Sequence, residues 1–229
     1  DWSSDVCSSD LVSIVGSEKE ELFEVTRLDA ERTQVRVFDL DKNDERDELL
    51  YERIFLNRET KELLLYGLDD DDVFQVSGDV PKSIKVRLIG GLGEDQFIDR
   101  SSVRGLSRVT KVHDNLQKNK LDVGPETEDK RSRRPEYNTY DFKARQYEHN
   151  YAMVLPFFGF NPDDGVFLGA NVTALRYGFG KPDFAQRHTF SGRYAFATSA
   201  YNFGYTGEFA DFIGKWDAVI AAKIQAPQY

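Results

Sequence analysis

The sequence has almost no cysteine. Its single thiol, Cys7, lies in residues 1–11, a stretch that reads as translated sequencing adapter and that we leave out of fold reasoning. The rest of the chain has no cysteine, which excludes disulfides, cysteine-based metal sites and a cysteine nucleophile there. An initiator methionine is also lacking, and we expect the chain to be a fragment.

Long apolar runs and basic charge are lacking too. No stretch of about eighteen apolar residues occurs, which excludes helical membrane spans. Lysine and arginine number 30 against 40 aspartates and glutamates, and this balance argues against nucleic acid as a partner because phosphates require a basic surface. Neither G-x-S-x-G nor a phosphate-binding loop occurs, and the histidines form no H-x-x-x-H pair. We therefore predict no enzyme activity within this chain.

What the chain does have is a series of alternating segments in residues 151–226. Each is roughly ten residues long, ends in Gly, Pro, Asn or Asp, and has one apolar face and one small or polar face. In an outer-membrane barrel the apolar face would meet lipid, whereas in a soluble sandwich it would point into a core. Of the 30 aromatic residues, 18 lie beyond residue 150, and a tilted membrane strand needs about 9–11 residues, so the barrel is favoured. The predicted lipid-facing residues are Phe190, Tyr194, Phe196, Phe203, Tyr205, Phe209 and Trp216.

The polar face of two neighbouring segments carries a candidate ion pair, Arg193 with Glu208. A hairpin turn at Ser199 and Ala200 would place Phe190 opposite Phe209, and a shift of two residues would place glycines opposite aromatic rings. Either register keeps the aromatic stripe on one face, because only an odd shift reverses the faces.

Residues 12–114 read as a separate β-rich region, either a sandwich or a β-solenoid, because short strand-like segments alternate with turn residues. The entire acidic excess lies before residue 151. Between the two regions, residues 115–148 combine low hydrophobicity with mixed charge, which predicts a polar linker. The fold class expected is all-β, with residues 149–229 forming the first strands of a truncated barrel.

Residues 90–97, G-G-L-G-E-D-Q-F, match the glycine-rich calcium-binding repeat of RTX proteins, and residues 67–74 are a poorer copy. Carboxylates and turn carbonyls suit calcium, so Asp72 and Asp95 are the candidate ligands. The alternative is that both stretches are Asp/Gly-rich turns between strands, without a cofactor.

Several motifs beyond residue 150 resemble the opening strands of BamA/TamA-like bacterial surface-antigen barrels: residues 160–169, 177–179, 194–198 and 207–209. Upstream, residues 15–21, 59–63, 66–69 and 90–91 are similar to the region that precedes such a barrel. Relatives often carry a metallophosphoesterase domain further upstream. The D-x-H and G-N-H-[DE] motifs of that domain are absent from this chain, so its catalytic residues cannot be carried over.

The resemblance implies a protein of the cell outer membrane with its N-terminal region in the periplasm. Its expected role is assembly, insertion or export of envelope proteins or lipids, with membrane lipid and client envelope proteins as partners. Two alternatives stay open: a calcium-stabilised adhesion module with the aromatic stripe buried in a sandwich, and the non-catalytic part of a membrane-anchored metallophosphoesterase.

Overall fold

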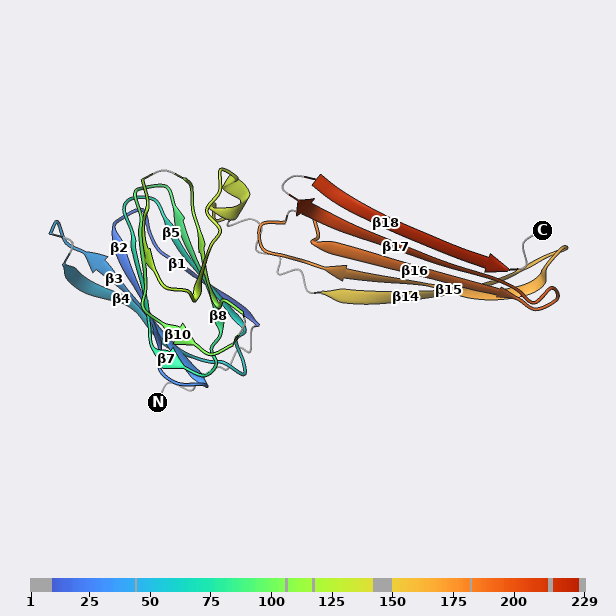
Figure 1. Cartoon of the computed structure of the whole chain (residues 1–229), viewed down its shortest axis with the longest axis horizontal. Helices are drawn as coiled ribbons and strands as arrows, with labels where there is room; N and C mark the ends of the chain where they lie inside the picture. The colour runs from blue at the N-terminus through green and yellow to red at the C-terminus, as the bar shows by residue number, and fades with distance from the viewer. Residues whose placement is uncertain are drawn as a thin grey trace. The chain divides into compact units, whose positions relative to one another are not determined.

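The computed structural model describes residues 10–43, 45–105, 107–116, 118–141, 150–181, 183–213 and 216–226. They divide into two units, residues 1–142 and 143–229, and each unit is considered by itself. The predicted all-β class is confirmed, because every described element is a strand except the short 3-10 turn η1, Pro135–Tyr137 (Figure 1). Most of the adapter-like stretch, residues 1–9, lies outside the described residues.

The first unit is a parallel β-solenoid, one of the two architectures that its sequence left open. The chain runs alternately through two sheets, and each full turn through both of them is called a coil here. One sheet is entirely parallel and has the order β1 (Leu11–Val15), β5 (Glu62–Leu68), β8 (Lys85–Gly91), β11 (Thr110–His113), β13 (Thr127–Asp129). The parallel part of the other sheet has the order β12 (Lys120–Val123), β9 (Gln96–Asp99), β6 (Val73–Ser77), β2 (Glu21–Arg27). A third, short sheet pairs β7 (Asp79–Val80) with β10 (Ser102–Val103).

Most successive coils place equivalent residues beside each other at a spacing of 23 or 24 residues. The last pair, β11 with β13, has a spacing of 17, since Thr110 pairs with Thr127. Glu62 pairs with Lys85, 23 positions on, and Gln96 pairs with Lys120, 24 positions on. The first coil is exceptional, since Leu22 pairs with Val73, 51 positions on. The difference is a hairpin, β3 (Arg32–Leu40) and β4 (Arg46–Leu56), which extends the second sheet beyond β2 in antiparallel fashion (Figure 1).

The core lies between the two sheets and consists of like residues stacked on like. Phe23, Phe74 and Phe97 are fully buried and stack in a column, with ring centroids 4.8 and 5.1 Å apart. Such offset-stacked aromatic pairs add to the stabilisation that apolar burial already provides. The inserted hairpin contributes Val35, Val37 and Phe55 to the same cluster, so it closes the core at the first coil.

A buried arginine lies inside the solenoid. The Arg27 guanidinium donates to the hydroxyls of Ser83, Ser101 and Thr110 and to the carbonyl of Ile84. Only 2% of this residue is exposed, and burial lowers the pKa of its guanidinium. Because it has partners from three later coils, Arg27 joins the first coil to the rest of the stack.

The predicted linker differs from the structure over most of its length. Residues 115–141 belong to the first unit, where β12 pairs with β9 and β13 pairs with β11. Their sequence is polar because the last coils have little core left to cover: β12 alternates between exposed and half-buried residues. The remainder of the predicted linker, residues 142–148, lies outside the described residues.

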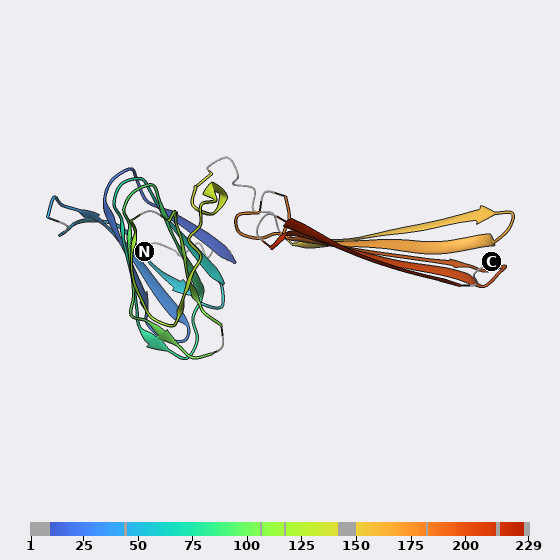
Figure 2. The same ribbon diagram turned by 45° about the horizontal axis from the view of Figure 1, so that its top comes forward.

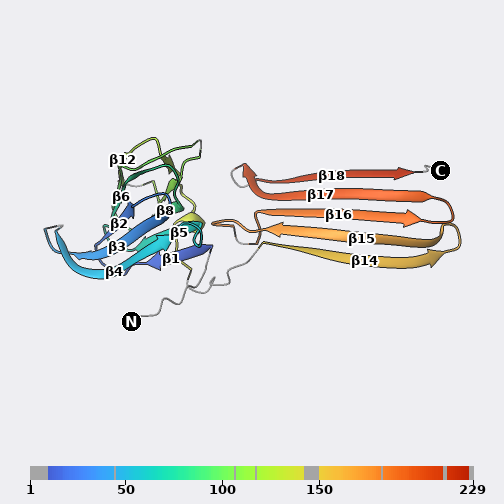
Figure 3. The ribbon, with the colours of Figure 1, turned by 90° about the horizontal axis from the view of Figure 1, so that it is seen from below.

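The second unit is one antiparallel sheet of five long strands in chain order. They are β14 (Tyr151–Asn161), β15 (Gly165–Arg176), β16 (Gln186–Ala195), β17 (Ala200–Ile213) and β18 (Trp216–Ala226). Figure 3 shows these strands side by side, and Figure 2 shows them as a single layer.

The hairpin register between β16 and β17 corrects both predicted registers. Phe190 pairs with Tyr205, and Gly192 pairs with Phe203, because a four-residue turn, 196–199, replaces the expected tight turn. The register is displaced by an even number of residues from both predictions, so the predicted division into faces is retained. The aromatic-over-glycine arrangement also occurs, with Phe203 lying against Gly192.

We predict that Arg27→Met destabilises the solenoid by about 3 kcal/mol, because it removes the charged donors from several buried acceptors. Urea unfolding followed by hydrogen exchange of peptides in β8 and β11 measures this loss. Arg104→Met, which changes an exposed arginine, is the matched control and should shift stability by no more than about 0.5 kcal/mol. Equal effects of the two substitutions would contradict the role given to Arg27.

Candidate functional site

Four residues occupy the same position in successive coils of the solenoid: Glu21, Asp72, Asp95 and Asn119. Together they are called the acceptor row. The backbone N–H of Glu21 donates to Asp72 Oδ1 at 2.9 Å, and that of Asp72 donates to Asp95 Oδ1 at 3.0 Å. The N–H of Asp95 donates in turn to Asn119 Oδ1 at 2.9 Å. The side chains of Asp72, Asp95 and Asn119 therefore each accept a hydrogen bond from the coil before.

A second row, five residues earlier in each coil, explains the glycines: Gly16, Gly67, Gly90 and then Asp114. A Cβ on Gly67 would lie 1.9 Å from Asp72 Oδ2 and 2.6 Å from the carbonyl oxygen of Gly90. A Cβ on Gly90 would lie 2.2 Å from Asp95 Oδ2. The carboxyl groups thus occupy the space of the missing side chains, which is why these positions require glycine.

The aspartate carboxyl groups of the two rows are buried and crowded. Asp72, Asp95 and Asp114 are each at most 1% exposed, and the Oδ2 atom of Asp72 has no hydrogen-bond partner among the described residues. Burial raises the pKa of Asp72 to about 9. Burial, and then the charge of Asp114, raise the pKa of Asp95 to about 8. Asp72 and Asp95 are accordingly held as neutral acids at neutral pH.

Asp114 stands where earlier coils have glycine, and this brings a second carboxyl group against Asp95. The Oδ2 atoms of the two residues lie 2.2 and 2.7 Å from the same point, the position a Cβ on Gly90 would take. Burial raises the pKa of Asp114 to about 6, against the lowering effect of hydrogen bonds from Asn115, Asp95 and Asn138. Two carboxylates so close would repel, so a proton on Asp95 is favoured beside Asp114.

The two predicted calcium ligands are brought together, as neighbours in the acceptor row. Calcium takes about six to eight oxygen ligands. Within the described residues, no group of three or more His, Cys, Asp or Glu side chains is arranged to hold a metal ion. One carboxyl oxygen of Asp72 and one of Asp95 already accept a backbone N–H.

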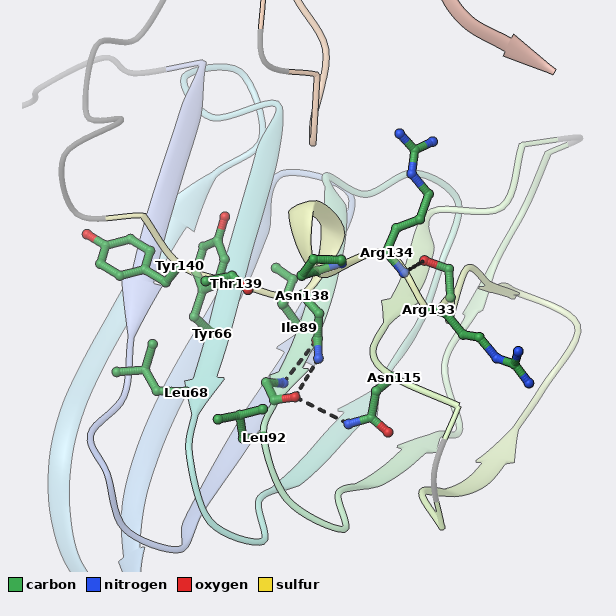
Figure 4. Close-up of a pocket in the computed structure, with 13 residues that line it drawn as sticks. Tyr66, Leu68, Ile89, Leu92, Asn115, Arg133, Arg134, Asn138, Thr139 and Tyr140 are labelled. Carbon is green, nitrogen blue, oxygen red and sulfur yellow. Dashed lines mark hydrogen bonds between the residues drawn. The ribbon is translucent and has the colours of Figure 1, made fainter. Parts of the chain in front are cut away.

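Near the last coils, a cavity of about 280 Å³ is bordered by Tyr66, Tyr140 and the segment that follows β13 (Figure 4). The Asn138 side chain points at Gly91, accepting from its N–H at 3.0 Å and donating to its carbonyl. The basic run 130–134 borders the cavity in part, yet Lys130 pairs with Glu128 at 2.7 Å and Arg131 with Asp129 at 2.9 Å. Much of its charge is therefore neutralised within the chain.

The sheet of the second unit has one face that is apolar on all five strands. Residues paired across neighbouring strands share a face, so the register assigns it directly. This apolar face consists of Ala152, Val154, Pro156, Phe158 and Phe160 on β14; Val166, Leu168, Ala170, Val172 and Ala174, with Arg176 at the strand end, on β15; Phe190, Gly192 and Tyr194 with Gln186 and His188 on β16; Tyr201, Phe203, Tyr205, Gly207 and Phe209 on β17; and Ala218, Ile220, Ala222, Ile224 and Ala226 on β18.

Many of these side chains are exposed in the described structure. Phe158 is 86% exposed and Phe160 70%, and Phe190, Tyr194 and Phe203 are also exposed, while Tyr205 and Phe209 are half-buried. Phe196 lies just beyond β16, in the turn, with its ring 5.2 Å from that of Tyr194. Trp216 begins β18 and is 79% exposed. A contiguous apolar surface of this kind is unusual on a protein that meets only water.

The opposite face, called the polar face, carries small and charged residues. Arg193 and Glu208 both lie on it, but the register does not pair them, which corrects the predicted ion pair. Glu208 lies opposite Arg187, with Nη1 and Oε2 3.2 Å apart. Arg193 lies opposite Asn202, and its guanidinium is 3.9 Å from Asp164 Oδ2.

The sequence motifs missed parts of both sites. On β14 the apolar side chains Phe158 and Phe160 were not singled out, because the polar face of this strand is itself apolar at Met153, Leu155 and Phe157, and alternation disappears. Phe157 fills the space over Gly169, its partner on β15, which is why an aromatic ring stands on that face. Asp114 and Asn119 were missed because they replace the glycine and aspartate of the motif.

Over the described residues, no helix is long and apolar enough to cross a membrane. Comparisons of the chain with protein-family models, with curated proteins and with solved structures found no match.

We predict that Asp72→Asn makes the solenoid more stable at alkaline pH and changes its pH dependence. The folded-state pKa of Asp72 is raised to about 9, above the unfolded value of about 3.9. The stability that the neutral acid confers is therefore fully present below about pH 4 and is lost as the pH rises through about 9. Asparagine keeps the acceptor without an ionisable group.

Urea unfolding of the parent chain and of Asp72→Asn, at pH values from about 5 to about 9, measures the difference between them. The unfolding free energy of the variant minus that of the parent should increase steadily as the pH rises. Two curves that stay parallel over this range would show that Asp72 is not the group responsible.

Proposed function

We propose that residues 151–226 form part of the wall of an outer-membrane β-barrel, and that the chain serves in the assembly, insertion or export of envelope proteins or lipids. The observation that carries this proposal is the apolar face, which continues across all five strands. Lipid is the environment in which such a face is stable when exposed, because transfer of apolar surface out of water is favourable.

Strand length and direction support the same environment. The five strands contain 10 to 14 residues, against the about 9–11 that a tilted strand needs to cross the hydrocarbon core. All neighbours are antiparallel and consecutive in the chain, as in the meander of membrane barrels. Backbone groups inside lipid must be paired, and this ladder pairs them between strands.

The polar face suits a barrel interior. Its ion pairs, Arg187 with Glu208 and Arg193 with Asp164, would be costly in hydrocarbon but are stable in a wet lumen. Two glycines on this face lie beneath aromatic rings of the neighbouring strand, Gly159 beneath Phe167 and Gly169 beneath Phe157. This packing fills the face without placing bulky side chains along its whole length.

The sheet requires further strands for this role. β14 and β18 each have one neighbour among the described strands, and an unpaired edge is not tolerated in lipid. Closure by strands from the rest of the protein or from a second copy is therefore part of the proposal.

The role in assembly or export rests on the BamA/TamA-like resemblance and on one feature of the solenoid. In the described structure, the eleven-residue strand β4 has β3 as its one neighbour, so its outer edge can accept an extended segment of a client protein. Main-chain hydrogen bonds would supply affinity there without a chemical step. We place the solenoid in the periplasm on the same resemblance.

The adhesion-module alternative requires the aromatic stripe to be buried in a sandwich. The described strands of the second unit form one sheet, with Phe158 and Phe160 exposed, and the acceptor row fits calcium poorly. The metallophosphoesterase alternative assumes the same barrel and is compatible with the present proposal.

Two adjacent residues at the middle of β16 distinguish the faces. Phe190→Arg should destabilise the barrel by about 2–4 kcal/mol if its face meets lipid near the midplane. Thr189→Arg, on the polar face, should cost no more than about 1 kcal/mol. The measurement is the unfolding of the complete protein in lipid vesicles, read from its heat-modifiable mobility in gels.

The matched control is the same pair of variants in the chain without lipid. If Phe190→Arg leaves the folded band unchanged in vesicles while Thr189→Arg abolishes it, the faces are reversed. A protein that never partitions into vesicles would overturn the membrane assignment itself.

A further inference from the structure

The glycine-rich motif implies calcium, and the geometry of the acceptor row points elsewhere. Calcium ligation would direct the free oxygens of Asp72 and Asp95 into a common space with other oxygens. Here each carboxyl group instead has one oxygen on the N–H of the preceding coil and the other packed over a glycine of its own coil.

We propose that the acceptor row is a hydrogen-bond ladder that joins the coils of the solenoid without a metal ion. Each rung is a side-chain oxygen that accepts the N–H of the equivalent residue one coil earlier. Without it, these N–H groups would be buried donors lacking a partner, which costs free energy comparable to a lost hydrogen bond.

The last rung shows what chemistry the position needs. Asn119 accepts from the N–H of Asp95 at 2.9 Å, at nearly the same distance as its aspartate counterparts in earlier coils. Its amide nitrogen donates to the carbonyl oxygen of Asn115 at 3.3 Å, so both ends of the amide have partners. An amide is a weak calcium ligand beside a carboxylate but an equal hydrogen-bond acceptor here. The property that these side chains share is therefore the ability to accept a hydrogen bond.

The first rung shows how the ladder ends. The other neighbour of β2 is the antiparallel strand β3, so among the described residues Glu21 has no N–H of an earlier row member to accept. Its longer side chain turns back within its own coil instead. Its Oε1 and Oε2 atoms accept from the N–H of Ser17 at 2.9 and 3.0 Å.

The charged groups that face the row are mostly acidic. Asp72 faces Glu21, Asp70 and Asp95, and Asp95 faces Asp71 and Asp114. Arg131 is a cation that acts on Asp114.

Substitution at Asp95 tests the ladder in the full chain. Asp95→Asn should leave the hydrogen exchange of the Asp72 amide as slow as in the parent chain, or slower, because the acceptor is retained. Asp95→Ala should speed that exchange by about tenfold or more, because the acceptor is lost. Asp79→Asn, on an exposed carboxyl group of the same unit, is the control for the general effect of charge removal and should match the parent.

The same measurements with millimolar calcium and with a chelator decide between the ladder and a metal site. The ladder predicts the same exchange rate in both conditions for the parent and for Asp95→Asn. Calcium that slows exchange in the parent tenfold, with loss of that effect in Asp95→Asn, would overturn the proposal and establish the metal site. Fast exchange in Asp95→Asn without calcium would overturn it as well.

If Asp95→Ala unfolds the chain, the Asp95→Asn arm still tests the ladder; if it folds, a double-mutant cycle tests the position of the Asp95 carboxyl group. Gly90→Ala places a Cβ 2.2 Å from Asp95 Oδ2, so it should be destabilising in the parent. In the Asp95→Ala background the added methyl group should destabilise the chain less, so the effects of the two substitutions should not be additive. Additive effects would show that the carboxyl group does not lie over Gly90, and the ladder would be wrong.

Discussion

Stacking of equivalent residues one strand spacing apart is the constraint on which the solenoid depends. Neighbouring strands are about 4.8 Å apart, so each side chain meets its own counterpart in the next coil. For an apolar residue this is favourable, and Phe23, Phe74 and Phe97 form a continuous column. For an ionisable residue it is unfavourable, because like charges are stacked. The same geometry therefore dictates both a phenylalanine column and a row of protonated aspartates.

The stack also has to end, and it ends differently on its two sides. At the first coil the hairpin of β3 and β4 covers the core, and Glu21 satisfies Ser17 within its own coil. At the last coils, Asp114 replaces the glycine of the repeat, and Asn138 binds both Asp114 and the backbone of Gly91. Both ends thus use a departure from the repeat to pair polar backbone groups within the chain. Departures of this kind mark the ends of repeat architectures in general.

How much of this could be predicted from the sequence depended on how regular the local pattern was. The all-β class and the division of β16 to β18 into two faces followed from strict alternation. The solenoid stayed one of two alternatives, because the hairpin raises the first repeat from 23 to 51 residues and hides the period. Asn119 and Asp114 broke the motif in the last coil, and the polar composition of β12 and β13 then read as a linker. The register of the β16–β17 hairpin depended on turn length, which neither face pattern nor composition specifies.

The sheet of the second unit obeys a different constraint, since it has no partner layer among the described strands. Each strand must therefore suit two environments at once, which is why alternation is strong from β15 to β18. β14 departs from the rule: its polar face carries Phe157 and Leu155 as well. In a closing barrel, such bulk on the inner face would be tolerated only where a neighbour is small, and Gly169 supplies that space opposite Phe157. Gly159 on β14 lies opposite Phe167 on β15, so the same pairing of a glycine with an aromatic ring occurs with the two strands interchanged. The two reciprocal pairs fix the register of β14 on β15, because a shift of two residues would set Phe157 against Phe167 and leave both glycines uncovered.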